Sequence, residues 1–176
     1  MRIRTTLCGS APWLAVDPLL LNFPAGLPMN SLSASDGTGI LMALITWSNS
    51  YSVGVKMLDS QHTVLFGILN DLHAAMMNGL AQKPTGDLLK KLVSYTRDHF
   101  ATEEAMMAKT NYPEFLHHKA HHRDLTRQVR QFMARYERGD SKVNIEPLRF
   151  LSDWLTKHIQ REDKEYGPWL NQRGLC

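Results

Sequence analysis

The chain has 176 residues, of which 43% are hydrophobic and 21% charged, the size and composition of one ordinary globular domain with a real core. Acidic and basic residues are interleaved along the chain and give a formal net charge of +3. The chain therefore has no basic block of the kind that would indicate a nucleic-acid partner. The longest apolar runs are broken by proline or charge well before the ~20 residues that a membrane-spanning helix needs, which argues against a membrane protein.

Residues 1–41 differ in composition from the rest of the chain. They contain four of the eight prolines and a Ser/Gly-rich run from Ser31 to Gly39, and they show no helical periodicity. We expect this extension to be disordered or absent from the mature protein, with Met42 as the true start. A signal peptide is the alternative, but Pro12 and Asp17 interrupt its apolar region.

Residues 42–176 form the predicted folded domain, because helical periodicity begins after Trp47. The first helix is expected from Asp59, a plausible N-cap, to Gly79. The second should start after Pro84-Thr85-Gly86 and end near Asn111.

Two further helices follow. The third should have Pro113 in its first turn and stop at Gly139. The fourth should have Asn144 as N-cap and Pro147 in its first turn, and Gly167-Pro168 should stop it. Since the connections are short, the predicted fold class is all-α: an up-down-up-down antiparallel four-helix bundle.

Each predicted helix directs a histidine into its own apolar stripe. On a wheel of about 100° per residue, the histidines concerned are His62, His99, His118 and His158. A polar ring in a core is costly unless it is satisfied, so four such rings need a common partner. A metal ion is the simplest one, and histidine with Asp or Glu is a suitable ligand set.

Pairs of residues one helical turn apart strengthen the metal hypothesis. His99 with Glu103, and His118 with His122, are i,i+4 pairs whose side chains stack on one helix face. Either pair alone is weak evidence for a metal site. Together, each on the apolar stripe of its helix, they are much stronger.

Three other histidines are not assigned to this site. His117 and His121 also form an i,i+4 pair, but they lie off the centre of the apolar stripe and should face solvent or the rim. His73 shares the stripe of His62 but lies about 16 Å along the axis, too far to reach the same centre. We interpret it as a hydrogen-bonded histidine deeper in the bundle.

From Met42 to Tyr166 the sequence resembles the hemerythrins, especially the single-domain bacterial ones. The opening Trp47 belongs to the resemblance. So do four motifs: Asp59-x-Gln61-His62; His99-x-x-x-Glu103; Tyr112-Pro113 leading into His118-x-x-x-His122; and Trp154-Leu155-x-x-His158-Ile159-x-x-x-Asp163-Lys164-x-Tyr166. All seven of the family's ligand positions occur in order on four helices, which makes the resemblance specific.

The resemblance implies a non-haem di-iron centre, with two iron ions (Fe2+/Fe3+) per chain. The implied ligands are His118, His122 and His158 on one iron, His62 and His99 on the other, and Glu103 and Asp163 as bridges beside an oxo or hydroxo bridge. The iron with two histidines would keep one open position, where dioxygen would bind reversibly.

Asp163 is the one implied ligand that helix geometry does not favour. It follows His158 by five residues, about 140° further round an ideal helix, whereas Glu162 follows by four and lies better on a wheel. A local widening of the helix, such as a π-type turn, would bring Asp163 onto the face of His158. We follow the resemblance and assign Asp163.

We expect an oxygen carrier, store or delivery protein rather than an enzyme. Five neutral histidines and only two carboxylates should weaken electron donation into bound dioxygen, so binding should stop short of O–O cleavage. An oxygen or redox sensor would need an attached output domain, and an oxidase or peroxidase would need a further acid near the open iron. A site that mainly stores a divalent metal stays open.

We expect a cytoplasmic monomer that binds dioxygen, with delivery to an oxygen-using enzyme as a further role. The two cysteines, Cys8 and Cys176, lie near opposite ends of the chain. They form neither a disulfide framework nor a zinc-ligand spacing, which suits a reducing compartment.

Overall fold

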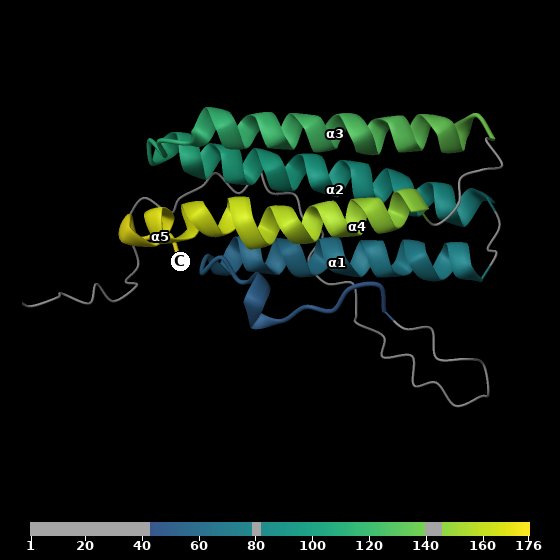
Figure 1. Cartoon of the computed structure of the whole chain (residues 1–176), viewed down its shortest axis with the longest axis horizontal. Helices are drawn as coiled ribbons and strands as arrows, with labels where there is room; N and C mark the ends of the chain where they lie inside the picture. Colours follow the sequence, from purple (N-terminus) through teal and green to yellow (C-terminus); the bar gives the residue numbers. More distant parts are fainter. Residues whose placement is uncertain (1–42, 79–81, 140–145) are drawn as a thin grey trace, which may run out of the picture. The chain divides into compact units, whose positions relative to one another are not determined.

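The computed structural model describes residues 43–78, 82–139 and 146–176, and within these ranges it contains helices and no strand. The elements are a short 3-10 helix (Asn49–Tyr51), α1 (Lys56–Met77), α2 (Gln82–Lys109), α3 (Phe115–Glu137), α4 (Glu146–His158), a π-helical turn (Ile159–Asp163) and α5 (Lys164–Gln172). Four long helical segments lie side by side and alternate in direction (Figure 1). They are α1, α2, α3 and the continuous run of α4, the π-helical turn and α5. The predicted all-α four-helix bundle is confirmed.

The start of α1 differs from the prediction. The helix begins at Lys56, so Asp59 lies inside the first turn and is not the N-cap. Its carboxylate accepts hydrogen bonds from Ser52 Oγ at 2.6 Å and from Val53 N at 2.8 Å. Asp59 therefore fastens the preceding loop to the helix, a role that depends on residues upstream of the helix and not on helix capping.

The start of α2 differs from the prediction, which placed Pro84-Thr85-Gly86 before the helix, whereas the end of α2 and the bounds of α3 lie within a few residues of the predictions. α2 begins at Gln82, so Pro84 stands in its first turn, where the missing N–H breaks no helical hydrogen bond. Asn111, with φ 52°, ends the turn after α2. α3 begins at Phe115, so Pro113 precedes the helix, and Gly139, with φ 70°, follows its end as predicted.

The last helical segment, which begins with α4, continues beyond Gly167-Pro168, where it was predicted to stop. Pro147 lies in the first turn of α4 as expected, and Asn144 falls outside the described residues. The π-helical turn leads directly into α5, which contains Pro168 and ends at Gln172. Pro168 is exposed, so water can solvate the carbonyl that loses its partner.

Tertiary contacts hold this last segment in place. A Cβ at position 167 would collide with the Val53 carbonyl oxygen, so the close approach requires Gly167. Trp169 Nε1 donates to the Thr110 carbonyl at 3.2 Å, and the Arg173 guanidinium stacks on the Trp169 ring at 3.3 Å. These contacts explain why α5 stays helical after a Gly-Pro pair.

The segment before α1 packs along the bundle. Ile45 N donates to Asn70 Oδ1 at 3.1 Å, and Asn70 Nδ2 donates to the Ile45 carbonyl at 2.8 Å. Trp47 and Tyr51 place their rings against Phe66 of α1, at 5.9 and 5.0 Å between centroids. The segment thus covers the side of α1 that also carries His62.

Buried apolar side chains fill the space between the helices. The buried ones include Leu58, Phe66, Leu69, Leu92, Leu125 and Leu151, and Met106 and Trp154 are partly buried and pack against them. Among the described helices, none has the length and apolarity needed to cross a membrane. Against this apolar background the buried histidines and carboxylates are conspicuous, and they converge on one place.

Candidate metal centre

All seven predicted ligands are buried in the middle of the bundle. None of them is more than 3% exposed, and they come from α1, α2, α3, α4 and the π-helical turn. α1 supplies His62; α2 supplies His99 and Glu103; α3 supplies His118 and His122; α4 and the π-helical turn supply His158 and Asp163. The structure therefore brings together every residue of the predicted set.

The π-helical turn accounts for the position of Asp163. It covers Ile159–Asp163, the five residues that follow His158. A π-turn has one residue more than an α-helical turn, so the fifth residue after His158 returns to the helix face that His158 occupies. Asp163 Oδ1 lies 3.1 Å from His158 Nε2, and both side chains are buried. The predicted widening of the helix is confirmed.

The seven residues form two groups whose ligand atoms can each surround one cation. The five-residue group is Glu103, His118, His122, His158 and Asp163, and the four-residue group is His62, His99, Glu103 and Asp163. In each group, the ligand atoms all lie within 4.8 Å of one another. Glu103 and Asp163 belong to both groups, as bridging ligands between two ions would.

Glu103 presents a different oxygen to each group. Its Oε1 lies 3.6 Å from His62 Nε2 and 3.4 Å from His99 Nε2. Its Oε2 lies 3.0 Å from His122 Nε2 in the five-residue group. The carboxylate is thus placed across the gap between the two groups.

Asp163 divides its oxygens in the same way. Oδ2 lies 3.3 Å from His62 Nε2, while Oδ1 lies 3.4 Å from His118 Nε2 and 3.1 Å from His158 Nε2. Two carboxylates that each face both groups are placed where bridging ligands between two cations would lie.

Many polar atoms of this cluster have no hydrogen-bond partner. Buried atoms without a hydrogen bond include both ring nitrogens of His62 and His158, His99 Nε2, Glu103 Oε2 and both oxygens of Asp163. An unsatisfied buried polar atom costs about 1–3 kcal/mol. The Nε2 atoms of His118 and His122 lie 2.9 Å apart, close to the roughly 3 Å between neighbouring ligands at about 2.1 Å from one octahedral ion. The cluster fits metal ions.

Hydrogen bonds from outside the cluster orient two of its imidazoles. The Nδ1 of His99 lies 2.9 Å from Gln61 Oε1, and the Nδ1 of His122 lies 3.2 Å from Glu104 Oε1. If Nδ1 carries the proton and donates it outward, Nε2 turns its lone pair toward the centre. Gln61 and Glu104 therefore fix both the tautomer and the orientation of these rings.

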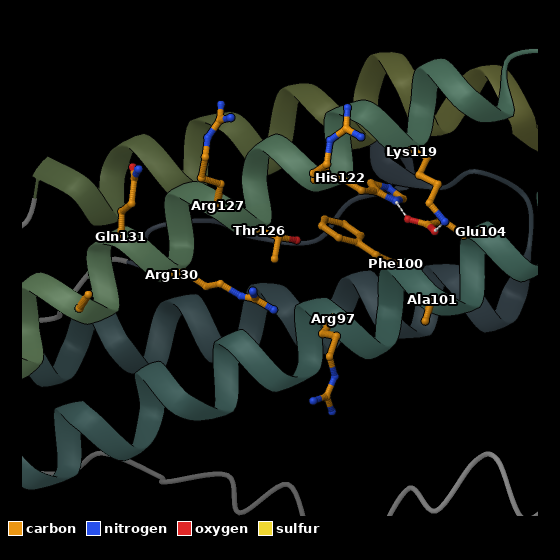
Figure 2. Close-up of a pocket in the computed structure, with 12 residues that line it drawn as sticks. Arg97, Phe100, Ala101, Glu104, Lys119, His122, Thr126, Arg127, Arg130 and Gln131 are labelled. Atoms are coloured by element: carbon orange, nitrogen blue, oxygen red, sulfur yellow. Dashed lines mark hydrogen bonds and ion pairs between the residues drawn. The ribbon is translucent and has the colours of Figure 1, made fainter.

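Figure 2 shows the Glu104 contact from the side of an open groove between α2 and α3. The groove has a volume of about 690 Å³, and Phe100, Glu104, Lys119 and His122 are among its lining residues. Glu104 Oε2 pairs with Lys119 Nζ at 2.7 Å. The Phe100 ring stacks on His122 at 3.7 Å, so this ring and the Glu104–Lys119 pair separate the centre from the groove.

Two further aromatic side chains touch the cluster. Tyr166 donates its hydroxyl proton to Glu103 Oε1, and both groups are buried. The Trp154 ring stacks on the ring of His158 at 4.5 Å between centroids. Gln61 and Tyr166 belong to the motifs quoted from the sequence, but no periodicity indicated the roles of Glu104 or Lys119, because each depends on contact between two helices.

Burial and the two carboxylates set the protonation of the histidines. Burial lowers the pKa values of His99 and His118 to about 4, so both rings are neutral near pH 7. Burial opposes protonation of His62 and His122 too, but the close contacts and charges of neighbouring carboxylates outweigh it and raise both pKa values to about 9. The metal-free cluster therefore carries protons on these two rings, which bound cations would replace.

The carboxylates stay ionised. Burial alone would raise the pKa of Glu103, but its close contacts with His99, His122 and His62 hold it well below its usual value. Burial and the charge of Glu103 act against ionisation of Asp163, yet His158 and His62 lower its pKa as well. Two buried anions in one place favour a site for cations.

The remaining histidines lie outside this centre, as predicted. His117 is exposed and His121 is half-buried. Together with Glu162 they form a third group with the geometry of a cation site. His73 is half-buried and, within the described residues, belongs to none of the three groups and makes no side-chain hydrogen bond, so its predicted role as a hydrogen-bonded histidine deeper in the bundle is not confirmed.

Comparison with known proteins agrees with this geometry. The family profile "Hemerythrin HHE cation binding domain" matches residues 53–170. A bacteriohemerythrin of Methylococcus capsulatus is 36% identical over 131 residues, which cover 74% of this chain and 99% of that protein. A bacteriohemerythrin of Stenotrophomonas maltophilia is 32% identical over 125 residues, 71% of this chain and 80% of the relative. A crystal structure of wild-type hemerythrin aligns with a TM-score of 0.69 at 36% identity, covering 73% of this chain and 98% of that one.

Proposed function

The chain belongs to the hemerythrin family, and from this premise we propose that its buried cluster holds two iron ions and binds dioxygen reversibly. Five imidazole nitrogens and two carboxylates are suitable ligands for iron(II). The bound iron pair would supply the two electrons that dioxygen takes up on binding and returns on release. A carrier, store or delivery protein is the function that this arrangement supports best.

The observation that carries the proposal is the unequal number of donors in the two groups. The five-residue group offers one donor more than the four-residue group, and both share the same two carboxylates. With one solvent-derived bridge, the first group would fill an octahedral shell, while the second would leave one position for an external ligand. That position would lie on the side of His62 and His99.

The surroundings of the four-residue group favour binding without further reaction. Within the described residues, Glu103 and Asp163 are the only buried acids, and both face the cluster. Tyr166 has a pKa raised by burial and by the two carboxylates, and its hydroxyl proton is donated to Glu103. Among the residues that the structure describes, no additional buried acid is present to deliver a proton to bound dioxygen, as an oxidase or peroxidase would require.

Apolar and aromatic side chains would also exclude water. Leu58 and Phe66 are buried in α1, and Trp47 lies 6.5 Å from the ring of His62. This shell would slow the arrival of water and protons, and with it the irreversible loss of reduced oxygen. Reversibility is thus attributed to residues of this chain and not to the metal alone.

The test is the visible absorption spectrum of the reduced, iron-loaded protein through cycles of air and argon. We expect a charge-transfer band that appears with air, fades when oxygen is removed, and returns with little loss over repeated cycles. A direct change to a stable oxidised spectrum, with oxygen consumed after each chemical reduction, would shift the assignment to an oxidase or a redox sensor. Absence of bound iron would contradict the proposal at its base.

A further inference from the structure

A second cluster of side chains of the kind that bind metals lies at the surface. Each of its residues stands one position before a predicted ligand of the buried centre. His117, His121 and Glu162 directly precede His118, His122 and Asp163 in the sequence. Their ligand atoms all lie within 4.8 Å of one another. His117 is exposed, while His121 and Glu162 are half-buried, so solvent reaches the group.

We propose that His117, His121 and Glu162 form a separate, solvent-accessible site for one divalent transition-metal ion. This surface site shares no residue with the buried centre, so the proposal does not depend on iron or on dioxygen binding. Two imidazoles and one carboxylate suit ions such as Zn²⁺, Co²⁺, Ni²⁺ or Cu²⁺. Three protein ligands leave at least one position for water.

The two histidines already have the spacing of ligands on one ion. His117 Nε2 and His121 Nε2 lie 3.3 Å apart, with the ring centroids separated by 4.6 Å. Two nitrogens at about 2.05 Å from a tetrahedral ion lie roughly 3.3 Å apart. The separation is therefore the one expected for two ligands of one tetrahedral ion.

The π-helical turn supplies the third ligand. In an unbroken α-helix, Glu162 would occupy the fourth position after His158 and would lie on its face. The extra residue of the π-turn brings Asp163 to that face, and Glu162 lies instead beside the histidine pair of α3. One local widening of the helix thus serves both clusters.

The surface site adjoins the buried centre through the ring of His121. This ring lies 6.4 Å from that of His158, with an interplanar angle of 28°. A cation held by His117, His121 and Glu162 would also join α3 to the π-helical turn, directly next to Asp163. Occupancy should therefore raise the unfolding temperature of the protein.

The experiment is a calorimetric titration of the iron-loaded protein, prepared without a histidine tag, with Zn²⁺. We expect one Zn²⁺ to bind per chain, with the iron content and visible spectrum unchanged and the melting temperature increased. In the variant His117→Gln/His121→Gln, affinity should fall by more than about a hundredfold, because even residues outside the coordination shell are worth 10–100-fold. Glu162→Gln should weaken Zn²⁺ binding less.

The matched control is His73→Gln, which removes a histidine that belongs to none of the three groups. It should bind Zn²⁺ as the native chain does. Equal Zn²⁺ binding by the native chain and the double variant would overturn the proposal, as would Zn²⁺ uptake matched by loss of iron. If the protein takes up no iron at all, the proposed function fails, yet the double variant should still bind one Zn²⁺ fewer than the native chain.

Discussion

Helix α3 carries two histidine pairs with the same spacing, displaced by one residue. His118 and His122 are 3% and 2% exposed and face two buried carboxylates. His117 is exposed, and its pair with His121 meets a single carboxylate, that of Glu162. Spacing alone therefore does not define the site. Burial and the number of carboxylates that converge on each pair separate a two-ion centre from a surface site.

The largest expected effect comes from exchanging a carboxylate for an amide in one cluster at a time. Asp163→Asn removes a bridge that faces three histidines, so the iron content measured by mass spectrometry should fall from two per chain to less than one. Glu162→Gln, one residue earlier, is the matched control and should keep both irons. Equal iron contents in the two variants would mean that the clusters are not distinct.

Removal of the buried metal should destabilise the fold strongly. A ligand at a thousand times its dissociation constant stabilises by about 4 kcal/mol. In a chain of this size that corresponds to about 10 °C in melting temperature. We expect chelated protein to melt lower by this amount in differential scanning calorimetry, whereas loss of Zn²⁺ from the surface site should cost only a few degrees. A chelated protein that melts like the loaded one would contradict the ligand assignment.

Metal binding at the buried centre should compete with protons. In the metal-free state His62 and His122 have pKa values of about 9, so both are charged near pH 7, and both must lose a proton to bind a metal. Affinity should therefore rise from pH 6 to about pH 9 and then level off. Calorimetry at pH 7 in buffers of different ionisation enthalpy should report release of about two protons. Release of none would contradict the protonation of these two rings.

The change of folding stability with pH follows from the same two histidines. Because their pKa values in the metal-free fold lie above the ordinary 6.5, they stabilise that fold fully below about pH 6.5. This contribution is lost as the pH rises through about 9. The metal-free protein should thus lose stability over this interval, while its affinity for metal increases. Chemical unfolding of the chelated protein at several pH values measures this loss of stability.

The smallest effect is expected outside the coordination shell. Glu104→Gln keeps an acceptor for His122 Nδ1 but removes the charge that pairs with Lys119. Metal affinity should fall by about tenfold, the lower limit for such partners. Glu137→Gln, which neutralises an exposed acid at the end of α3, should leave the affinity unchanged. Competition with a chelator of known affinity measures both, and equal values would remove Glu104 from the account.

The bundle and the seven converging residues could be predicted because helical periodicity and residue spacing are local properties of the sequence. Asp163 needed the family resemblance as well, since an ideal helix favours Glu162, and the π-helical turn now supplies the physical reason. Predictions that depended on contacts between distant residues were less accurate. Asp59 binds the preceding loop instead of capping α1, and Gly167-Pro168 does not stop the last helix.

The surface cluster shows the same division between local and distant information. The pair His117 and His121 was predicted to face solvent or the rim, and it does. The third member, Glu162, could not be assigned to that pair from the sequence. Its position depends on how the π-helical turn packs beside α3, which no spacing within one helix reveals.

The central claim is that Glu103 and Asp163 bridge two iron ions inside the bundle. A crystal structure of the iron-loaded protein, with anomalous diffraction measured at the iron absorption edge, tests it most directly. We predict two iron peaks about 3.5–4 Å apart, each in contact with both carboxylates, one beside His118, His122 and His158 and the other beside His62 and His99. A single buried peak, or two peaks that do not share Glu103 and Asp163, would contradict the account.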